Sequence, residues 1–140
     1  SEPPRPESAS TIGGAVAAGF SGPARPWAGA LRDHVLGVGL ISPAGDLLRF
    51  GGRVMKNVAG YDVSRLVTGA WGTFGPIATL ALRVAPRPES TRCAIWEMNA
   101  REGLARMLRL ARESWPLTGA AHDGRRLRLR FAGAAAAVDE

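Results

Sequence analysis

The sequence predicts an α+β fold in two parts, residues 1–88 and residues 89–140. Apolar runs of strand length alternate with helical patterns, short turns join neighbouring strands, and the composition changes after Pro88. Strands joined by short turns pair antiparallel, so we expect an antiparallel hairpin in the first part. In the second part, the order strand, helix, strand, strand, helix predicts the start of another α+β layer, incomplete at its end.

The first part opens on an extended, proline-rich lead-in at residues 1–10. A short helix of small residues is expected at 13–19, closed by Gly19, and a loop at 20–27. An apolar run at 35–42 then begins a β-hairpin. Because this run is apolar on both faces, it is typical of a covered central strand.

The return arm of the hairpin covers residues 47–50, and a loop is expected at 51–60. Asp62 then predicts the N-cap of a helix over 63–68, which Gly69 ends. A strand is predicted at 77–84 before the prolines at 86 and 88. Its alternating apolar residues are expected to share one face: Ala78, Leu80, Leu82 and Val84.

The second part begins with a predicted strand at 91–98. Asn99 and Glu102 have the spacing of a capping box at the start of a helix. Apolar residues at helical spacing predict one buried stripe on that helix: Leu104, Met107, Leu108, Ala111 and Trp115.

A strand at 117–121, an Asp-Gly turn at 122–125 and an alternating run at 126–131 predict a second hairpin. The opening of a further helix is expected at 133–140. The alternation places three arginines on one face of the strand: Arg126, Arg128 and Arg130. Two interpretations of this face remain open, a solvated sheet surface and a docking surface for an acidic protein partner.

Composition excludes several classes of function. The chain has 140 residues, a net charge of +6 and a single cysteine, so an internal disulfide and a cysteine metal cluster are excluded. The cations are scattered arginines, which argues against nucleic-acid binding, and no apolar run has the length of a membrane span. We expect a cytoplasmic protein in which Cys93 is a buried, inert thiol. His34 and His122 lie too far apart in sequence to have metal-ligand spacing, so no metal site is expected.

No residue pattern here indicates a side-chain catalyst. Instead, Gly13 and Gly14 at a helix start would let main-chain amides approach a pyrophosphate, and Thr11 could add a hydroxyl. The turn at residues 72–75 could pass beside an adenine or a ribose. Taken alone, both segments are equally compatible with tight structural turns.

One polar constellation stands apart from these glycine segments: Lys56, Asn57, Tyr61 and Asp62. Lys56 could neutralise a phosphate or an acid substrate, and Tyr61 could donate to a carbonyl. The interpretation that we favour is structural. In it, Asp62 caps its helix, Tyr61 packs and Lys56 is solvated.

The order of these segments resembles the PCMH-type FAD-binding domain of the vanillyl-alcohol oxidase family. The resemblance rests on five stretches and is strong over residues 3–88: 11–14, 33–38, 45–46, 56–66 and 69–75. It implies the second α+β subdomain of that domain, a mostly antiparallel sheet flanked by helices. The first subdomain is missing, and the start of an α+β cap-like domain follows at 89–140.

The resemblance also implies FAD as the cofactor. Eight residues would contact the cofactor: Thr11, Gly13, Gly14, Ala18, Gly19, Ser21, Gly75 and Ile77. The first six, from the diglycine segment, would lie along the pyrophosphate and flavin, and the last two would meet the adenosine end. The implied reaction is oxidation of a 2-hydroxy acid, glycolate to glyoxylate, by hydride transfer to the flavin. The family's histidine-rich catalytic site has no counterpart at 91–140, so no catalytic residue is expected in this chain.

A supporting flavin subunit therefore fits better than a self-sufficient oxidase. Its expected partners are a catalytic flavin subunit and an iron–sulfur subunit of the same complex, in the cytoplasm or at the inner face of the membrane. Self-association of the chain is also plausible, because a partial flavin domain exposes surface that is normally covered. Two alternatives stay open, another FAD-linked hydroxy-acid dehydrogenase of the D-lactate type and a cofactor-free assembly module.

Overall fold

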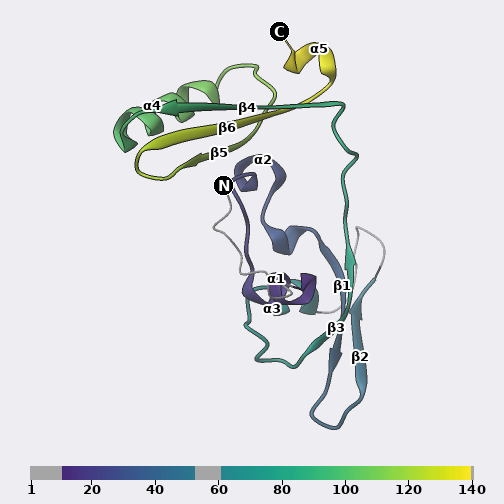
Figure 1. Cartoon of the computed structure of the whole chain (residues 1–140). Helices are drawn as coiled ribbons and strands as arrows, with labels where there is room; N and C mark the ends of the chain where they lie inside the picture. The colour runs from purple at the N-terminus through teal and green to yellow at the C-terminus, as the bar shows by residue number, and fades with distance from the viewer. Residues whose placement is uncertain (1–10, 53–60, 140) are drawn as a thin grey trace. The chain divides into compact units, whose positions relative to one another are not determined.

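The computed structural model describes residues 11–52 and 61–139, which divide into two compact units. The first unit comprises Ser1–Gly22 with Gly29–Ala85, and the second comprises Pro23–Ala28 with Pro86–Glu140. Each unit holds one three-stranded antiparallel sheet with short helices (Figure 1). The expected α+β class, with antiparallel sheets flanked by helices, is therefore confirmed.

The sheet of the first unit has the strand order β2-β1-β3. Strand β1 (Val35–Ile41) is central, as its apolar composition predicted, and β2 (Leu47–Gly51) and β3 (Ile77–Leu82) lie on its two sides. Helix α3 (Val63–Val67) packs on one face of this sheet, where Val38, Leu40 and Val67 form the buried core. Burial of each such side chain stabilises the fold by roughly 1.5–3 kcal/mol.

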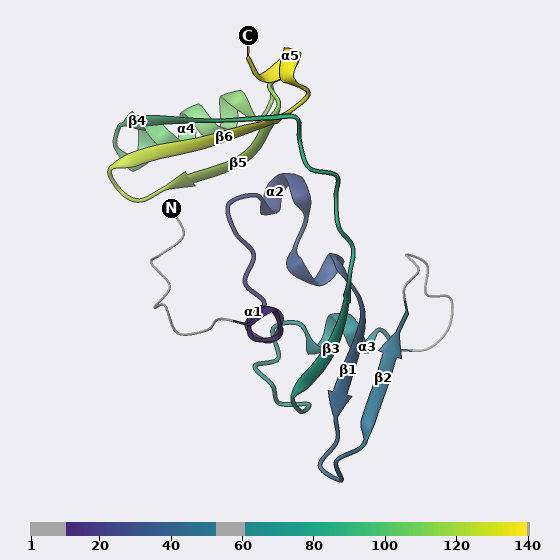
Figure 2. The ribbon, with the colours of Figure 1, turned by 45° about the vertical axis from the view of Figure 1, so that its right-hand side comes forward.

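Helix α1 (Ile12–Ala18) lies beside β3 and is bonded to the loop after α3, and a 3₁₀ turn, η1 (Leu31–Asp33), precedes β1 (Figure 2). Gly19 ends α1 in the left-handed conformation, with φ of 67°, and its amide bonds back to the carbonyl of Val16. Asp62 caps α3 by accepting from the amide of Arg65 at 3.1 Å. Both helix boundaries agree with the local sequence signals.

In the second unit the strand order is β4-β6-β5, with β4 (Ser90–Glu97), β5 (Leu117–His122) and β6 (Arg126–Gly133). Helix α4 (Ala100–Leu110) covers one face, and its start carries the predicted capping box of Asn99 and Glu102. The core is Leu110, Leu117, Leu127 and Leu129. A last short helix, α5 (Ala135–Val138), contacts β4 and β6.

Several local expectations are wrong. Residues 20–27 do not form a loop throughout, because α2 (Arg25–Ala28) is helical and contacts β5. Val84 lies beyond β3 and is 86% exposed. Ala78 is the extra residue of a bulge opposite Gly39 and Leu40, so Ile77 instead of Ala78 packs against the core.

The apolar stripe predicted on α4 is only partly confirmed, since Met107 packs against the core but Leu104, Leu108 and Trp115 are exposed. The buried positions are Gly103 and Leu110. A Cβ on Gly103 would lie 2.5 Å from Cδ2 of His122, so the helix approaches the sheet at its glycine and not at its leucines.

Cys93 is exposed, contrary to the expectation of a buried thiol. Its register partner on β6 is Arg130, and antiparallel partners share a face of the sheet. Cys93 therefore lies on the arginine face, which is opposite α4.

Candidate functional site

Two of the separately predicted segments meet at the edge of the first sheet. A Cβ built on Gly13, in the first turn of α1, would lie 3.7 Å from the carbonyl oxygen of Ile77 and 3.8 Å from its Cβ. Between α1 and β3 runs a shallow groove of about 260 Å³, lined by Ile12, Gly13, Ile77, Ala78, Thr79, Leu80 and Leu82. The absence of a side chain on Gly13 keeps this groove open.

The outer edge of β3 faces away from the sheet. The amide of Arg83 bonds to the carbonyl of His34 and so points toward β1. Because main-chain groups alternate along a strand, those of Leu82 and Leu80 point away from β1, toward the edge where the groove lies. The groove thus combines apolar walls with main-chain donors and acceptors.

Thr11 and Gly14 bond to each other at the entrance of α1. The hydroxyl oxygen of Thr11 accepts from the amide of Gly14 at 3.0 Å, which is an N-cap contact. In the described part of the chain, the amides of Ile12 and Gly13 have no hydrogen-bond acceptor. The amide of Gly13 is therefore the one in the diglycine pair that is free to meet a ligand.

Ala18, Gly19 and Ser21 lie at the other end of α1, beside the loop after α3. A Cβ on Gly19 would lie only 2.9 Å from the Cα of Gly69. The Ser21 hydroxyl accepts from the amide of Leu31 at 2.9 Å, so it fixes the entry to η1. Gly19 and Ser21 therefore stabilise the local fold, in addition to any contact with a ligand.

Backbone geometry requires a glycine at position 75. Its φ is 118°, and a Cβ there would collide with the carbonyl oxygen of Ile41. The structure therefore explains this glycine by the junction of β1 and β3 alone.

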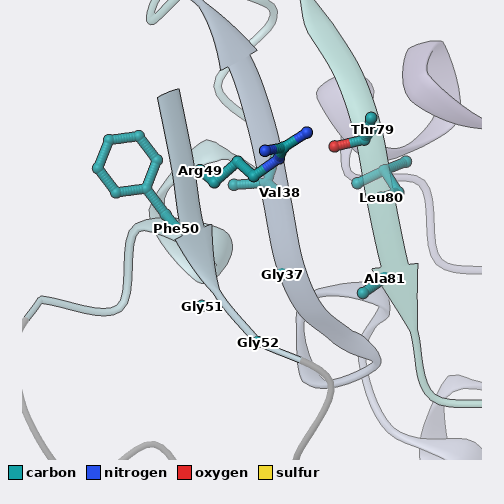
Figure 3. Close-up of a pocket in the computed structure, with 9 residues that line it drawn as sticks. All are labelled: Gly37, Val38, Arg49, Phe50, Gly51, Gly52, Thr79, Leu80 and Ala81. Atoms are coloured by element: carbon teal, nitrogen blue, oxygen red, sulfur yellow. The ribbon is translucent and has the colours of Figure 1, made fainter. Parts of the chain in front are cut away.

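A second hollow, of about 340 Å³, lies on the sheet face opposite α3 and shares no residue with the predicted set (Figure 3). Glycines 37, 51 and 52 line it together with Thr79 and Ala81, and Arg49 reaches across β1 above it. A Cβ on Gly37 would lie 2.9 Å from the carbonyl oxygen of Gly52, so close packing of β1 and the end of β2 explains that glycine.

The polar constellation is only partly described, because Lys56 and Asn57 lie outside the described residues. Asp62 caps α3 and pairs with Arg65 at 3.3 Å, as the structural interpretation expected. Tyr61 does not pack, since it is 95% exposed.

The three side chains of the arginine face have hydrogen-bond or ion-pair partners within the chain. Glu97 pairs with Arg126 at 3.2 Å, Asp123 pairs with Arg128, and Arg130 donates to the hydroxyl of Thr118. Two backbone amides, from Arg126 and Arg125, and then Arg128 hold the pKa of Asp123 far below its ordinary value. These internal contacts favour a self-satisfied sheet face over a docking surface for acids.

His122 uses both ring nitrogens in the second unit. Nδ1 accepts from the amide of Gly124, so Nε2 carries the proton and donates to the carbonyl of Met98 at 3.0 Å. In the described residues, no group of three or more histidine, cysteine or acidic side chains has the arrangement of a metal site. Nor does any described helix have the length and apolarity to cross a membrane.

Two features of this region were not foreseen in the sequence, the free edge of β3 and the exposed Trp71. The edge follows from strand order, which local pattern does not encode. Trp71 lies two residues after Gly69. Its exposed fraction of 73% depends on the fold and not on the local sequence.

No family model matches the chain. Among curated proteins, glycolate oxidase subunit GlcE of Escherichia coli (strain K12) is 40% identical over 137 residues, covering 98% of this chain and 39% of GlcE. Glycolate oxidase subunit GlcD of Bacillus subtilis (strain 168) is 38% identical over 99 residues, covering 68% of this chain and 21% of GlcD. A D-lactate dehydrogenase of Anaerostipes hadrus is 37% identical over 89 residues, covering 63% of this chain and 19% of that protein. This chain thus spans well under half the length of these relatives.

Solved structures agree on the fold. An alkyldihydroxyacetonephosphate synthase matches with a TM-score of 0.69 at 17% identity, covering 93% of this chain and 30% of that one. The berberine bridge enzyme of Eschscholzia californica matches with a TM-score of 0.56 at 21% identity, covering 86% of this chain and 25% of that one. The chain is thus similar over nearly its whole length to a segment of glycolate oxidase subunit GlcE, and its fold is that of PCMH-type FAD-binding proteins.

Proposed function

We propose that this chain forms part of an FAD site in a glycolate-oxidising flavoprotein. The supporting observation is that Gly13 and Ile77, assigned to the cofactor from separate stretches of sequence, lie side by side across one groove. The residues fit the cofactor there because a Cβ on Gly13 would project into space that a ligand needs.

The chain's own residues have distinct parts in this proposal. Gly13, with Thr11 and Gly14 around it, lets the main chain approach the pyrophosphate. The outward main-chain groups of Leu80 offer a donor and an acceptor to the adenine, and the apolar walls of the groove exclude water. Ala18, Gly19 and Ser21 border the flavin. Gly75 contributes indirectly, by allowing the tight junction of β1 and β3.

FAD, when bound, supplies a hydride acceptor for oxidation of a 2-hydroxy acid. Glycolate is the substrate that we propose, since GlcE matches nearly all of this chain at 40% identity. The partners in this proposal are a catalytic flavin subunit and an iron–sulfur subunit. A D-lactate-type dehydrogenase is the second candidate, because proteins of that name match about two thirds of the chain.

A chimera tests this function. The chain replaces the matching segment of GlcE, and the purified chimera is assembled with its complex. We expect FAD on the purified chimera before assembly. In the assembled complex we expect anaerobic bleaching of the flavin by glycolate, with slower bleaching by D-lactate. Faster bleaching by D-lactate would favour the second candidate. A chimera that folds and assembles without FAD, while partner binding falls with salt, would favour the assembly module.

A further inference from the structure

Trp71 holds an unusual backbone conformation in the first unit. Its φ is 54°, the only positive φ of a non-glycine residue in the described part of the chain. A bulky residue in the left-handed region is strained and persists only where its surroundings hold it. Here its amide donates to the carbonyl of Ala17 at 2.9 Å, and the nearby amide of Gly69 donates to Val16 at 3.0 Å.

The Trp71 side chain is presented to solvent instead of to the core. It is 73% exposed and packs edge-to-face against Phe20, with ring centroids 6.3 Å apart and an interplanar angle of 85°. Phe20 is itself 65% exposed. Two large aromatic rings held together and left exposed mark a binding surface.

The position of Trp71 and Phe20 indicates which ligand they contact. Phe20 lies between Gly19 and Ser21, two residues of the flavin end in the proposed function, and the main chain before Trp71 contacts Gly19. A flavin carries a planar aromatic ring system, which aromatic side chains bind by stacking or edge contact. We propose that Trp71, supported by Phe20, contacts the isoalloxazine ring of FAD; this inference rests on the proposed function.

Two substitutions separate the ring from the backbone strain. Trp71→Ala and Trp71→Gly both remove the indole, but only glycine relieves the left-handed conformation. Trp71→Phe keeps an aromatic ring. Leu48→Ala is the control, because Leu48 is a half-exposed apolar residue on β2 of the same unit.

FAD and ADP are titrated against each variant in the 140-residue chain and in the GlcE chimera, because ADP carries the adenine and pyrophosphate without the flavin. We expect Trp71→Ala and Trp71→Gly to weaken FAD binding about tenfold and to leave ADP binding unchanged. Trp71→Gly should melt at a higher temperature than Trp71→Ala. In the wild type, FAD should quench tryptophan fluorescence, and less so in both variants.

Equal FAD affinity in Trp71→Ala and the wild type would overturn this inference while leaving the proposed function intact. So would an equal loss of ADP binding, which indicates a structural role, or an equal loss of FAD binding in Leu48→Ala. If the wild type binds neither ligand in either form, the proposed function itself fails.

Discussion

Gly19 and Gly69 approach each other so closely that a Cβ on Gly19 would lie 2.9 Å from the Cα of Gly69. This contact joins the end of α1 to the loop after α3, and the amide of Gly69 bonds to Val16 of α1 at the same place. The position of α1 in the first unit therefore depends on two glycines far apart in sequence.

Gly19→Ala should destabilise the chain by roughly 1–3 kcal/mol, because alanine is strained at φ of 67° and its Cβ meets backbone that cannot yield. Urea denaturation measures the change. Gly22→Ala is the control, since nothing lies within 4 Å of a Cβ there. A variant at position 19 as stable as that control would show that α1 can move away from Gly69.

Gly103→Ala should lower stability although alanine is the better helix former. The new Cβ would lie 2.5 Å from Cδ2 and 3.0 Å from Nε2 of His122, and displacing the ring breaks its bond to Met98. We expect a loss of about 2 kcal/mol, which exceeds the gain of about 1 kcal/mol from helix propensity. Thermal unfolding of the chain and the variant would measure it; a rise in melting temperature would contradict the packing of α4 at Gly103.

Stability should fall in acid partly through Asp123, whose pKa in the folded chain is held down by the amides of Arg126 and Arg125 and by Arg128. Because the pKa of Asp123 is lower in the folded chain, its carboxylate stabilises the fold at pH values above the unfolded-state pKa of about 3.9. This contribution is lost as the pH falls below that value. Asp123→Asn should therefore lose less stability between pH 5 and pH 2 than the wild type. Parallel pH profiles from urea denaturation would contradict this role of Asp123.

Local signals were enough to predict most elements of the fold. The left-handed Gly19, the Asp62 cap and the pairing of Asn99 with Glu102 each act within one turn of chain, so sequence spacing reveals them. The apolar composition of β1 likewise predicted its central place.

Faces and long-range contacts were harder to predict. Cys93 is exposed because α4 covers the other face of the sheet, where Gly103 lies against His122. The bulge at Ala78 changed which residues of β3 face the core. At the candidate site, the pair of glycines at a helix start pointed to Gly13 and the resemblance pointed to Ile77. Only the fold places these two residues side by side.

The most direct test of the FAD proposal is the visible absorbance spectrum of the chain after incubation with FAD and desalting, with Gly13→Val and Gly133→Val run in parallel. The Cβ of each valine meets only ordinary contacts within the protein, at 3.7 and 3.8 Å, and circular dichroism checks that both variants are folded. We predict that the wild type and Gly133→Val retain flavin absorbance, in the chain or in the GlcE chimera, and that Gly13→Val loses it. Flavin retained by a folded Gly13→Val would contradict the close approach of FAD to α1, and no flavin in any form would contradict the account as a whole.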